Sequence, residues 1–221
     1  MDSQVKTKKH WWLKLLFIFS ILSLLTILAF GYYVNIKIKD YKNKVQTLGK
    51  KFEATEGLNN YWFGTTTPKL SIVEFADFSC PYSKSSFSKI RTLGLKYKDK
   101  VKVIYRNYPY ISNYSLDLAI VAECAGKQGK FWQMHDKLFQ NQGVSKKEEF
   151  DALAKQIDLD LNIFNSCLTN KNQTTIQKDL ADAEKLGIKG VGAPIWFFNG
   201  YKIEGDMPME TMEKIIMEMT K

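Results

Sequence analysis

The amino-acid sequence predicts an α/β fold that carries a helical insert and is preceded by one N-terminal transmembrane helix. Three observations lead to this prediction. An uncharged apolar run fills residues 15–34. Further along, short apolar runs with β-branched members alternate with helical patterns. A long helical region at about 115–186 then separates a first pair of strands from a second pair. The length of 221 residues fits one domain with extensions, or two small domains.

The apolar run reads LLFIFSILSLLTILAFGYYV, twenty residues without a charge. A helix of that length extends about 30 Å, the hydrocarbon thickness of a bilayer. Two tryptophans precede it and two tyrosines lie near its end. Amphipathic aromatic rings of this kind are enriched at membrane interfaces. We therefore predict a basic cytoplasmic N-terminus at 1–14 and an uncleaved signal-anchor helix at 15–34. A cleavable signal peptide that ends near Ala29-Phe30-Gly31 stays open as the alternative.

Positive charge is concentrated near the N-terminus. The formal net charge is +9, and residues 1–51 hold ten lysines against two acidic residues. The remainder of the chain is therefore nearly neutral, so we expect no nucleic-acid partner and a membrane contact through residues 15–34. Lysines lie on both sides of the apolar run, so the positive-inside rule does not set its orientation.

A polar, lysine-rich segment follows at 35–59. Tyr41, Val45, Leu48 and Phe52 are spaced as one face of a helix. This spacing predicts a helical linker that packs on the domain or stands as a stalk.

The folded domain is predicted at 60–221. Residues 70–78 are apolar with β-branched members and indicate a strand. Residues 81–97 have a helical pattern, and residues 101–105 form a second apolar run. These segments give the order strand, helix, strand.

The second half of the domain completes this order. In the helical region, Ser145 and Glu148 have the spacing of a capping box at a helix start. Asn199-Gly200 lies between two apolar runs and predicts a β-hairpin with a type I′ turn. A closing helix follows at about 208–219. This order is that of a thioredoxin-like α/β fold with an inserted helical subdomain.

Cys80 is the main candidate for chemistry. It stands where a strand gives way to a helix, and a helix N-terminus stabilises a thiolate, the reactive form of cysteine. Pro81 suits the first helical turn, where no N–H is needed. Ser83 lies three residues on, where its hydroxyl is placed to donate a hydrogen bond to the sulfur. The alternative is a cysteine that only packs in the core.

Two further residues favour a reactive site. Glu74 lies in the apolar run SIVEFADF, where a buried carboxylate is costly unless it is paired or used in proton transfer. Pro194 precedes a strand that should be central, where proline gives no ladder hydrogen bond and a cis peptide bond is plausible. The alternatives are a Glu74 that reaches solvent or a lysine, and an ordinary turn at Pro194.

Several segments together resemble the DsbA-like thiol–disulfide oxidoreductases over about residues 60–220: SIVEFADFSCPYSK, VKVIYRNYPY, AECAGKQGKFWQMHDKLF, FNSCL and GVGAPIWFFNGYKIEG. The resemblance implies that Cys80 is the nucleophile and that Glu74 is the buried acid of the family. It also implies a peptide groove lined by cis-Pro194 with Ala193. Pro81 and Tyr82, inside the motif, are further candidates for binding substrate.

The family works outside the cytoplasm. The resemblance therefore implies a single-pass protein of the inner membrane, with its C-terminal domain in the periplasm or extracytoplasmic space. Its partners would be exported proteins that contain cysteine, and a redox partner that the sequence does not name.

The sequence departs from the family at Ser83, where the resolving cysteine of the family stands. Without that cysteine, a mixed disulfide on Cys80 needs an external thiol for its release. We therefore expect reduction, isomerisation or deglutathionylation more than oxidation. We expect no cofactor, and glutathione is a candidate co-substrate. A redox-inert peptide-binding or chaperone module is one alternative. A glutathione-linked transferase or isomerase is another.

Cys124 and Cys167 both lie in the helical region. In an oxidising compartment such a pair tends to form a disulfide, and some DsbA-like proteins resemble this chain in carrying a second bridge there. Two packed free thiols are the alternative. With one histidine in the domain, His135, and no cluster of cysteines, we expect no metal site.

Overall fold

The computed structural model describes residues 3–46, 51–53, 55–57, 61–170, 174–188, 190 and 192–221. The chain forms two compact units, residues 1–48 and 49–221. Each is described by itself.

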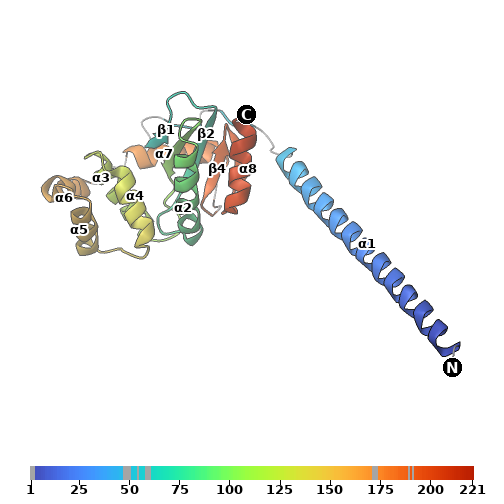
Figure 1. Cartoon of the computed structure of the whole chain (residues 1–221). Coiled ribbons are helices and arrows are strands. Elements are labelled where there is room, and N and C mark those ends of the chain that lie inside the picture. Colours follow the sequence, from blue (N-terminus) through green and yellow to red (C-terminus); the bar gives the residue numbers. More distant parts are fainter. Residues whose placement is uncertain are drawn as a thin grey trace. The chain divides into compact units, whose positions relative to one another are not determined.

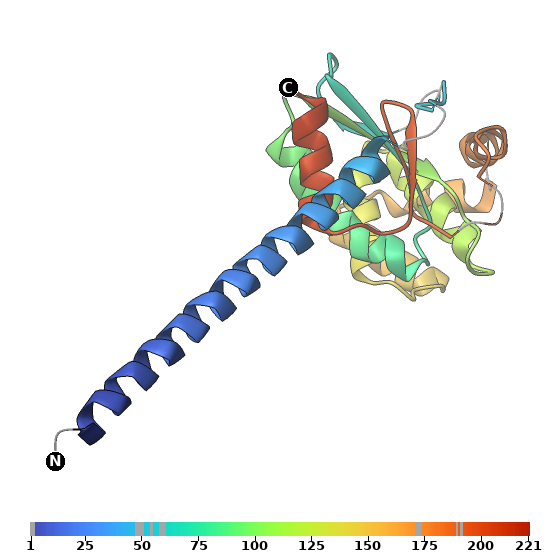
Figure 2. The ribbon, with the colours of Figure 1, turned by 90° about the vertical axis from the view of Figure 1, so that its right-hand side faces the viewer.

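The first unit is a single helix, α1 (Ser3–Gln46), which Figures 1 and 2 draw without a break. Within it, Leu13–Ile36 is long and apolar enough to cross a bilayer, with a mean hydropathy of 2.5. A signal sequence would meet the same criterion. The helix continues into the predicted linker as far as Gln46, but Phe52 is not helical, so the expected helical face is wrong at this residue. That ring packs edge-on against Phe197 in the domain, with centroids 5.6 Å apart. Leu48 lies outside the described residues.

A five-stranded sheet of order β1-β3-β2-β4-β5 forms the centre of the second unit. Its strands are β1 (Trp62–Gly64), β2 (Leu70–Ala76), β3 (Val101–Asn107), β4 (Ile195–Phe198) and β5 (Tyr201–Glu204). Strands β2 and β3 are parallel, and the other pairs are antiparallel. The sequence did not predict β1, because three residues are too few to show an alternating pattern.

Helices cover both faces of the sheet. On one face, α2 (Pro81–Lys96) and α8 (Met209–Met219) pack over a buried cluster that includes Ile72 and Trp196. On the other, α7 (Thr174–Lys185) packs over a cluster that includes Phe75 and Phe197. Figure 1 shows α2 and α8 on the near side of the strands and α7 behind them. The central strands are therefore buried on both faces, as their continuous apolar runs indicate.

The insert consists of α3 (Ser115–Gly126), α4 (Phe131–Gln140), α5 (Lys147–Gln156) and α6 (Leu161–Asn170), gathered at one end of the domain in Figure 1. The predicted helical region 115–186 also contains α7, which contacts both parts of the domain. Its Ile176 packs in the insert and its Ala183 packs under the sheet. The α/β fold with a helical insert is thus confirmed.

The cap of α5 differs from the prediction by one residue. The Glu149 carboxylate accepts hydrogen bonds from the N–H groups of Ser145 and Lys146, at 2.8 and 2.9 Å. The expected pair of Ser145 with Glu148 is wrong, because α5 begins at Lys147 and places Glu149 at the third helical position. In the β4–β5 hairpin the prediction is confirmed, since Asn199 and Gly200 adopt φ values of 48° and 89°.

Candidate active site

Cys80 lies at the junction of the strand β2 and the helix α2. It is the N-cap residue of α2, with extended backbone angles, and Pro81 takes the first helical position. The residue is only 2% exposed. Its thiol donates a hydrogen bond to the main-chain oxygen of Ala193, at 3.1 Å. The Ala193–Pro194 peptide bond is cis. The fold therefore brings the three residues together, although Cys80 and Ala193 are 113 positions apart in the sequence.

Ser83 is the third residue of α2, in its first turn, and is fully buried. Its hydroxyl oxygen accepts a long hydrogen bond, 3.5 Å, from the Asp77 N–H. The sequence placed this hydroxyl as a donor to the Cys80 sulfur, whereas the sulfur is bonded to Ala193 instead. The Ser83 proton is not engaged by the Asp77 contact, so a role at the sulfur stays a prediction. Cys80 is the one free cysteine of the described residues.

Asp77 is a site residue that the sequence did not single out. It is 1% exposed and accepts four hydrogen bonds. One carboxylate oxygen accepts from the N–H and the hydroxyl of Ser79, at 2.8 and 2.9 Å. The other accepts from the N–H groups of Tyr110 and Ile111, at 2.8 and 2.7 Å. Asp77 thus ties the turn before Cys80 to the loop after β3. Its partners are mainly backbone groups, which leave no pattern in the sequence.

Glu74 is buried in the middle of β2, between Tyr105 on β3 and Trp196 on β4. It is 2% exposed, and its Oε1 has no hydrogen-bond partner among the described residues. Burial raises the pKa of this carboxyl to about 8, and the nearby negative charge of Asp206 adds to the effect. The carboxyl is therefore protonated at neutral pH and can both give and take a proton.

The surroundings of Cys80 combine exposed rings with buried backbone. Tyr82 is 64% exposed at the start of α2, and Pro81 beside it is also exposed. Ala193 and Pro194 are buried. Tyr108 shares a buried cluster with Cys80, and its ring stacks on that of Tyr110, with centroids 5.7 Å apart. The β3–α3 loop therefore contributes one aromatic ring, that of Tyr108, to the cluster that contains the thiol.

A buried polar network lies at the end of β3. The guanidinium of Arg106 is fully buried and donates to Asp179 at 2.8 Å, to Asp182 at 2.7 Å and to the Thr55 carbonyl at 3.1 Å. Asp179 also accepts from the N–H of Asn107, at 2.8 Å. Burial raises the pKa of Asp179. This network fixes α7 against the end of β3.

Cys124 on α3 and Cys167 on α6 form a disulfide with Cα atoms 5.7 Å apart. His135 on α4 is fully buried among aromatic rings, and burial lowers its pKa. Among the described residues, no three His, Cys, Asp or Glu side chains gather as a metal site would require. His135 therefore belongs to the core of the insert.

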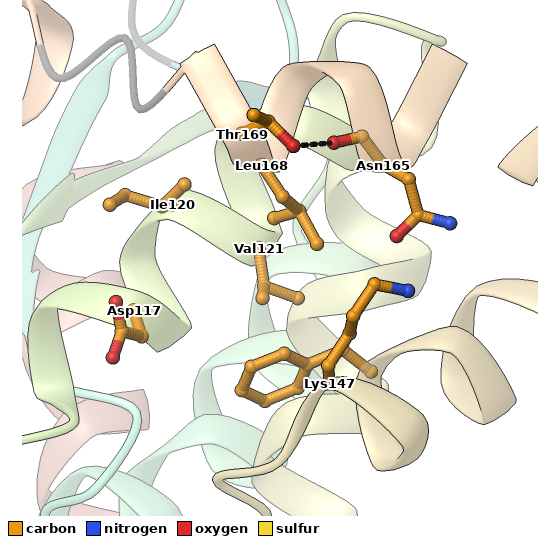
Figure 3. A pocket seen from close by; sticks show the side chains of 8 residues that line it. Asp117, Ile120, Val121, Lys147, Asn165, Leu168 and Thr169 are labelled. Atoms are coloured by element: carbon orange, nitrogen blue, oxygen red, sulfur yellow. Dashed lines mark hydrogen bonds between the residues drawn. The ribbon is translucent and has the colours of Figure 1, made fainter. Parts of the chain in front are cut away.

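A shallow pocket of about 220 Å³ lies between α3, α5 and α6 (Figure 3). Its floor is apolar, and its polar lining comes from Asp117, Lys147, Asn165 and Thr169. The Thr169 hydroxyl donates to the Asn165 carbonyl at 3.0 Å. None of its lining residues belongs to α2 or to the segment around Ala193, so the pocket is separate from the thiol.

The chain matches part of a longer curated protein. This relative, the Na(+)/H(+) antiporter NhaA 3 of Salinispora tropica, is 30% identical over 157 residues, which cover 70% of this chain. The chain spans 24% of the length of that relative, about a quarter.

Among solved structures, the thiol-disulfide exchange protein alpha-DsbA2 from Wolbachia pipientis superposes with a TM-score of 0.68 and 21% identity. The match covers 83% of this chain and 97% of that one. A periplasmic thioredoxin-like protein from Salmonella enterica serovar Typhimurium gives a TM-score of 0.63 and 24% identity, and covers 77% and 99%. These two matches show a DsbA-like fold. The Thioredoxin family model matches residues 57–218. The chain therefore belongs to the thioredoxin family.

Proposed function

We propose that this protein is a membrane-anchored, extracytoplasmic thiol–disulfide exchange enzyme that acts through the single thiol of Cys80. One observation carries the proposal. The Cys80 sulfur lies at the N-terminus of α2 against the backbone beside cis-Pro194, while Cys124 and Cys167 are bonded to each other. The site thus offers one thiol, and Ser83 stands where a second would lie.

The proposed chemistry follows from the presence of a single thiol at the site. The Cys80 thiolate attacks one sulfur of a substrate disulfide, the substrate S–S bond breaks, and its other sulfur leaves as a thiolate. A second cysteine of the substrate can then attack the mixed disulfide. This forms a new substrate disulfide, releases Cys80 and isomerises the substrate without net oxidation. Alternatively, two glutathione molecules release Cys80 and the substrate thiols, and leave as glutathione disulfide.

The surrounding groups have distinct tasks in this proposal. The N-terminus of α2 stabilises the thiolate through its unpaired N–H groups and its dipole. The carboxyl of Glu74, with its pKa raised to about 8, exchanges protons during the two steps. The backbone of Ala193 holds an extended substrate segment by strand-like pairing, with Pro194 below it and Pro81 and Tyr82 beside it.

The substrates in this proposal are exported polypeptides that contain cysteine. The apolar helix Leu13–Ile36 supports an attachment to the inner membrane with the domain outside the cytoplasm. The periplasmic description of the Salmonella neighbour supports the same side. The donor of reducing equivalents is a low-molecular-weight thiol such as glutathione, or a redox protein.

Trapping on non-reducing gels tests the proposal. Cells that make the wild-type chain should accumulate mixed disulfides that disappear on reduction and are absent from a Cys80→Ala variant. A Ser83→Cys variant supplies an internal resolving thiol and should show fewer trapped adducts. If the wild-type and Cys80→Ala chains give the same bands, the proposal is wrong.

A second candidate is a redox-inert module that binds extended peptides. The 2% exposure of Cys80 and the hydrogen bond of its thiol to Ala193 favour this candidate, because both hold the sulfur away from solvent. It predicts that peptide binding is the same in the wild-type and Cys80→Ala chains and that no mixed disulfide forms.

A further inference from the structure

Gln142 connects the insert to the turn that carries Cys80. It lies between α4 and α5, and its side-chain amide nitrogen donates two hydrogen bonds to main-chain oxygens. One goes to Phe78, at 3.0 Å, and the other goes to Cys80, at 2.9 Å. The two accepting carbonyls flank Ser79. A single NH₂ group from the insert therefore bridges the turn that orients the candidate nucleophile.

The backbone around Gln142 is held on both sides. Asn141 ends α4 with an N–H bond to the Lys137 carbonyl, at 2.9 Å. Glu149 caps the start of α5 through the N–H groups of Ser145 and Lys146. Gln142 is thus presented from a loop whose two ends are fixed by helix caps.

The turn is also held by the side chain of Phe78. Its ring packs against Phe139 of α4 with centroids 4.9 Å apart, and against Tyr105 at 5.2 Å. The insert therefore contacts Phe78 twice: Phe139 packs against the Phe78 ring, and Gln142 binds the Phe78 carbonyl. These contacts leave the peptide planes from Phe78 to Cys80 little freedom.

The two carbonyls matter for a thiolate because their oxygen atoms carry partial negative charge. A carbonyl oxygen that turns toward an adjacent thiolate raises the energy of the charged form. The two donated bonds from Gln142 fix the direction of both oxygens and offset part of their negative charge. The Cys80 carbonyl also accepts the first helical N–H bond, from Lys84 at 3.0 Å. The Gln142 bond thus supports the helix start on which the thiolate depends.

We propose that Gln142 is a positioning residue that tunes the reactivity of Cys80 from the insert. This inference rests on the proposed exchange function of Cys80 and concerns the control of the same site. The amide acts by fixing the Phe78 and Cys80 carbonyls, and it takes no part in bond making or breaking.

The test compares three variants of the full chain, purified in detergent with the Cys124–Cys167 disulfide intact. Gln142→Met removes the donors at similar size, Gln142→Lys keeps donors and adds positive charge, and Gln142→Glu adds negative charge. The rate of Cys80 alkylation by iodoacetamide is followed against pH. We expect the midpoint of the pH profile to rise in the order Lys, wild type, Met and Glu. The wild-type-to-Met step should be on the order of half a pH unit, within the range of single hydrogen-bond effects on titration.

Gln128 provides a matched control. It is also half-buried in the insert, and its amide donates to the Asp160 carbonyl at 3.1 Å. Gln128→Met and Gln128→Glu should lower the melting temperature comparably without moving the pH profile of Cys80. A Gln142→Met profile identical to that of the wild type would overturn the inference, whatever the melting temperature.

The role of Gln142 and the exchange function of Cys80 can fail independently of each other. If the wild-type thiol reacts with a small disulfide such as glutathione disulfide while the Gln142 variants leave its pH profile unchanged, Gln142 is only structural. If the wild-type thiol is alkylated but does not exchange with any disulfide, the proposed function fails. The ordered shift in alkylation would still assign Gln142 its effect on the sulfur.

Discussion

The Cys80 thiol donates a hydrogen bond to the main-chain oxygen of Ala193, 3.1 Å away, and so joins the start of α2 to the segment before β4. Only the protonated sulfur can make this bond, because a thiolate has no proton to donate. Conversion to the thiolate therefore breaks the contact and frees the Ala193 oxygen. Under the proposed function, that oxygen would then accept from a substrate N–H, so that ionisation of the sulfur and binding of the substrate backbone would be coupled.

Replacing Glu74 with Gln should change how stability depends on pH. The pKa of the carboxyl is about 8 in the folded chain, against an ordinary value of 4.5. Between these values the unfolded chain loses the proton first, so the free energy of unfolding falls as pH rises. This decrease in the free energy of unfolding is absent below pH 4.5 and complete above about pH 8. Between these values its limiting slope is about 1.4 kcal/mol per pH unit.

Urea denaturation at pH 5, 7 and 9 measures this effect. The Glu74→Gln variant should gain stability relative to the wild type as pH rises. Glu210→Gln, an exposed position on α8, serves as the control and should follow the wild type. A wild-type stability that is flat over this range would contradict the raised pKa of Glu74.

Removing the disulfide should lower stability without removing the candidate nucleophile. The bridge joins residues 43 positions apart, and closing such a loop contributes about 4 kcal/mol by the chain-entropy estimate. A Cys124→Ala, Cys167→Ala double variant should lose stability of this order in urea denaturation. A reductant should destabilise the wild type by a similar amount and leave the double variant unchanged. If the reductant destabilises both chains equally, the bridge is not the cause.

Asp77→Asn should loosen the loop after β3. In the wild type, both carboxylate oxygens of Asp77 accept hydrogen bonds. An asparagine amide keeps one acceptor oxygen, but its NH₂ group takes the place of the other and faces N–H groups that it cannot accept from. Hydrogen bonds to a charged acceptor contribute about 1.5–3 kcal/mol each, so we expect a loss of at least that size. Hydrogen exchange should show faster exchange at the Tyr110 and Ile111 amides. Asp117→Asn, an exposed change on α3, should leave both amides protected.

Arg106→Met should leave Asp179 buried without its cation. Removing one partner of a buried ion pair costs about 3–5 kcal/mol. Because burial already raises the pKa of Asp179, the variant can relieve the cost by protonating this carboxyl. The loss should therefore be largest at pH 7 and shrink as pH falls toward 4 in urea denaturation. Lys185→Met removes an exposed cation 3.4 Å from Asp182 and should cost little at either pH.

Some site residues could be read from the sequence because their own chemistry is unusual in its context. Cys80 follows a strand and precedes a proline, Glu74 interrupts an apolar run, and Pro194 opens a central strand. Asp77 and Gln142 gave no such signal, because they bind main-chain atoms that any residue would supply. The three-residue strand β1 and the start of α5 were missed for a related reason, since local patterns this short carry little information.

The sequence by itself determined the order of the strands β2 to β5 and of the helical regions between them, the apolar N-terminal helix, the β4–β5 turn at Asn199-Gly200 and a lone cysteine at a helix start. These follow from periodicity and backbone preference, which act over a few neighbouring residues. Only the tertiary structure decided that the Cys80 sulfur meets Ala193, that Glu74 is enclosed with its pKa raised to about 8, and that Gln142 reaches the carbonyls of Phe78 and Cys80. Those relationships depend on packing between distant segments, and burial and hydrogen-bond geometry exist only once the segments have met.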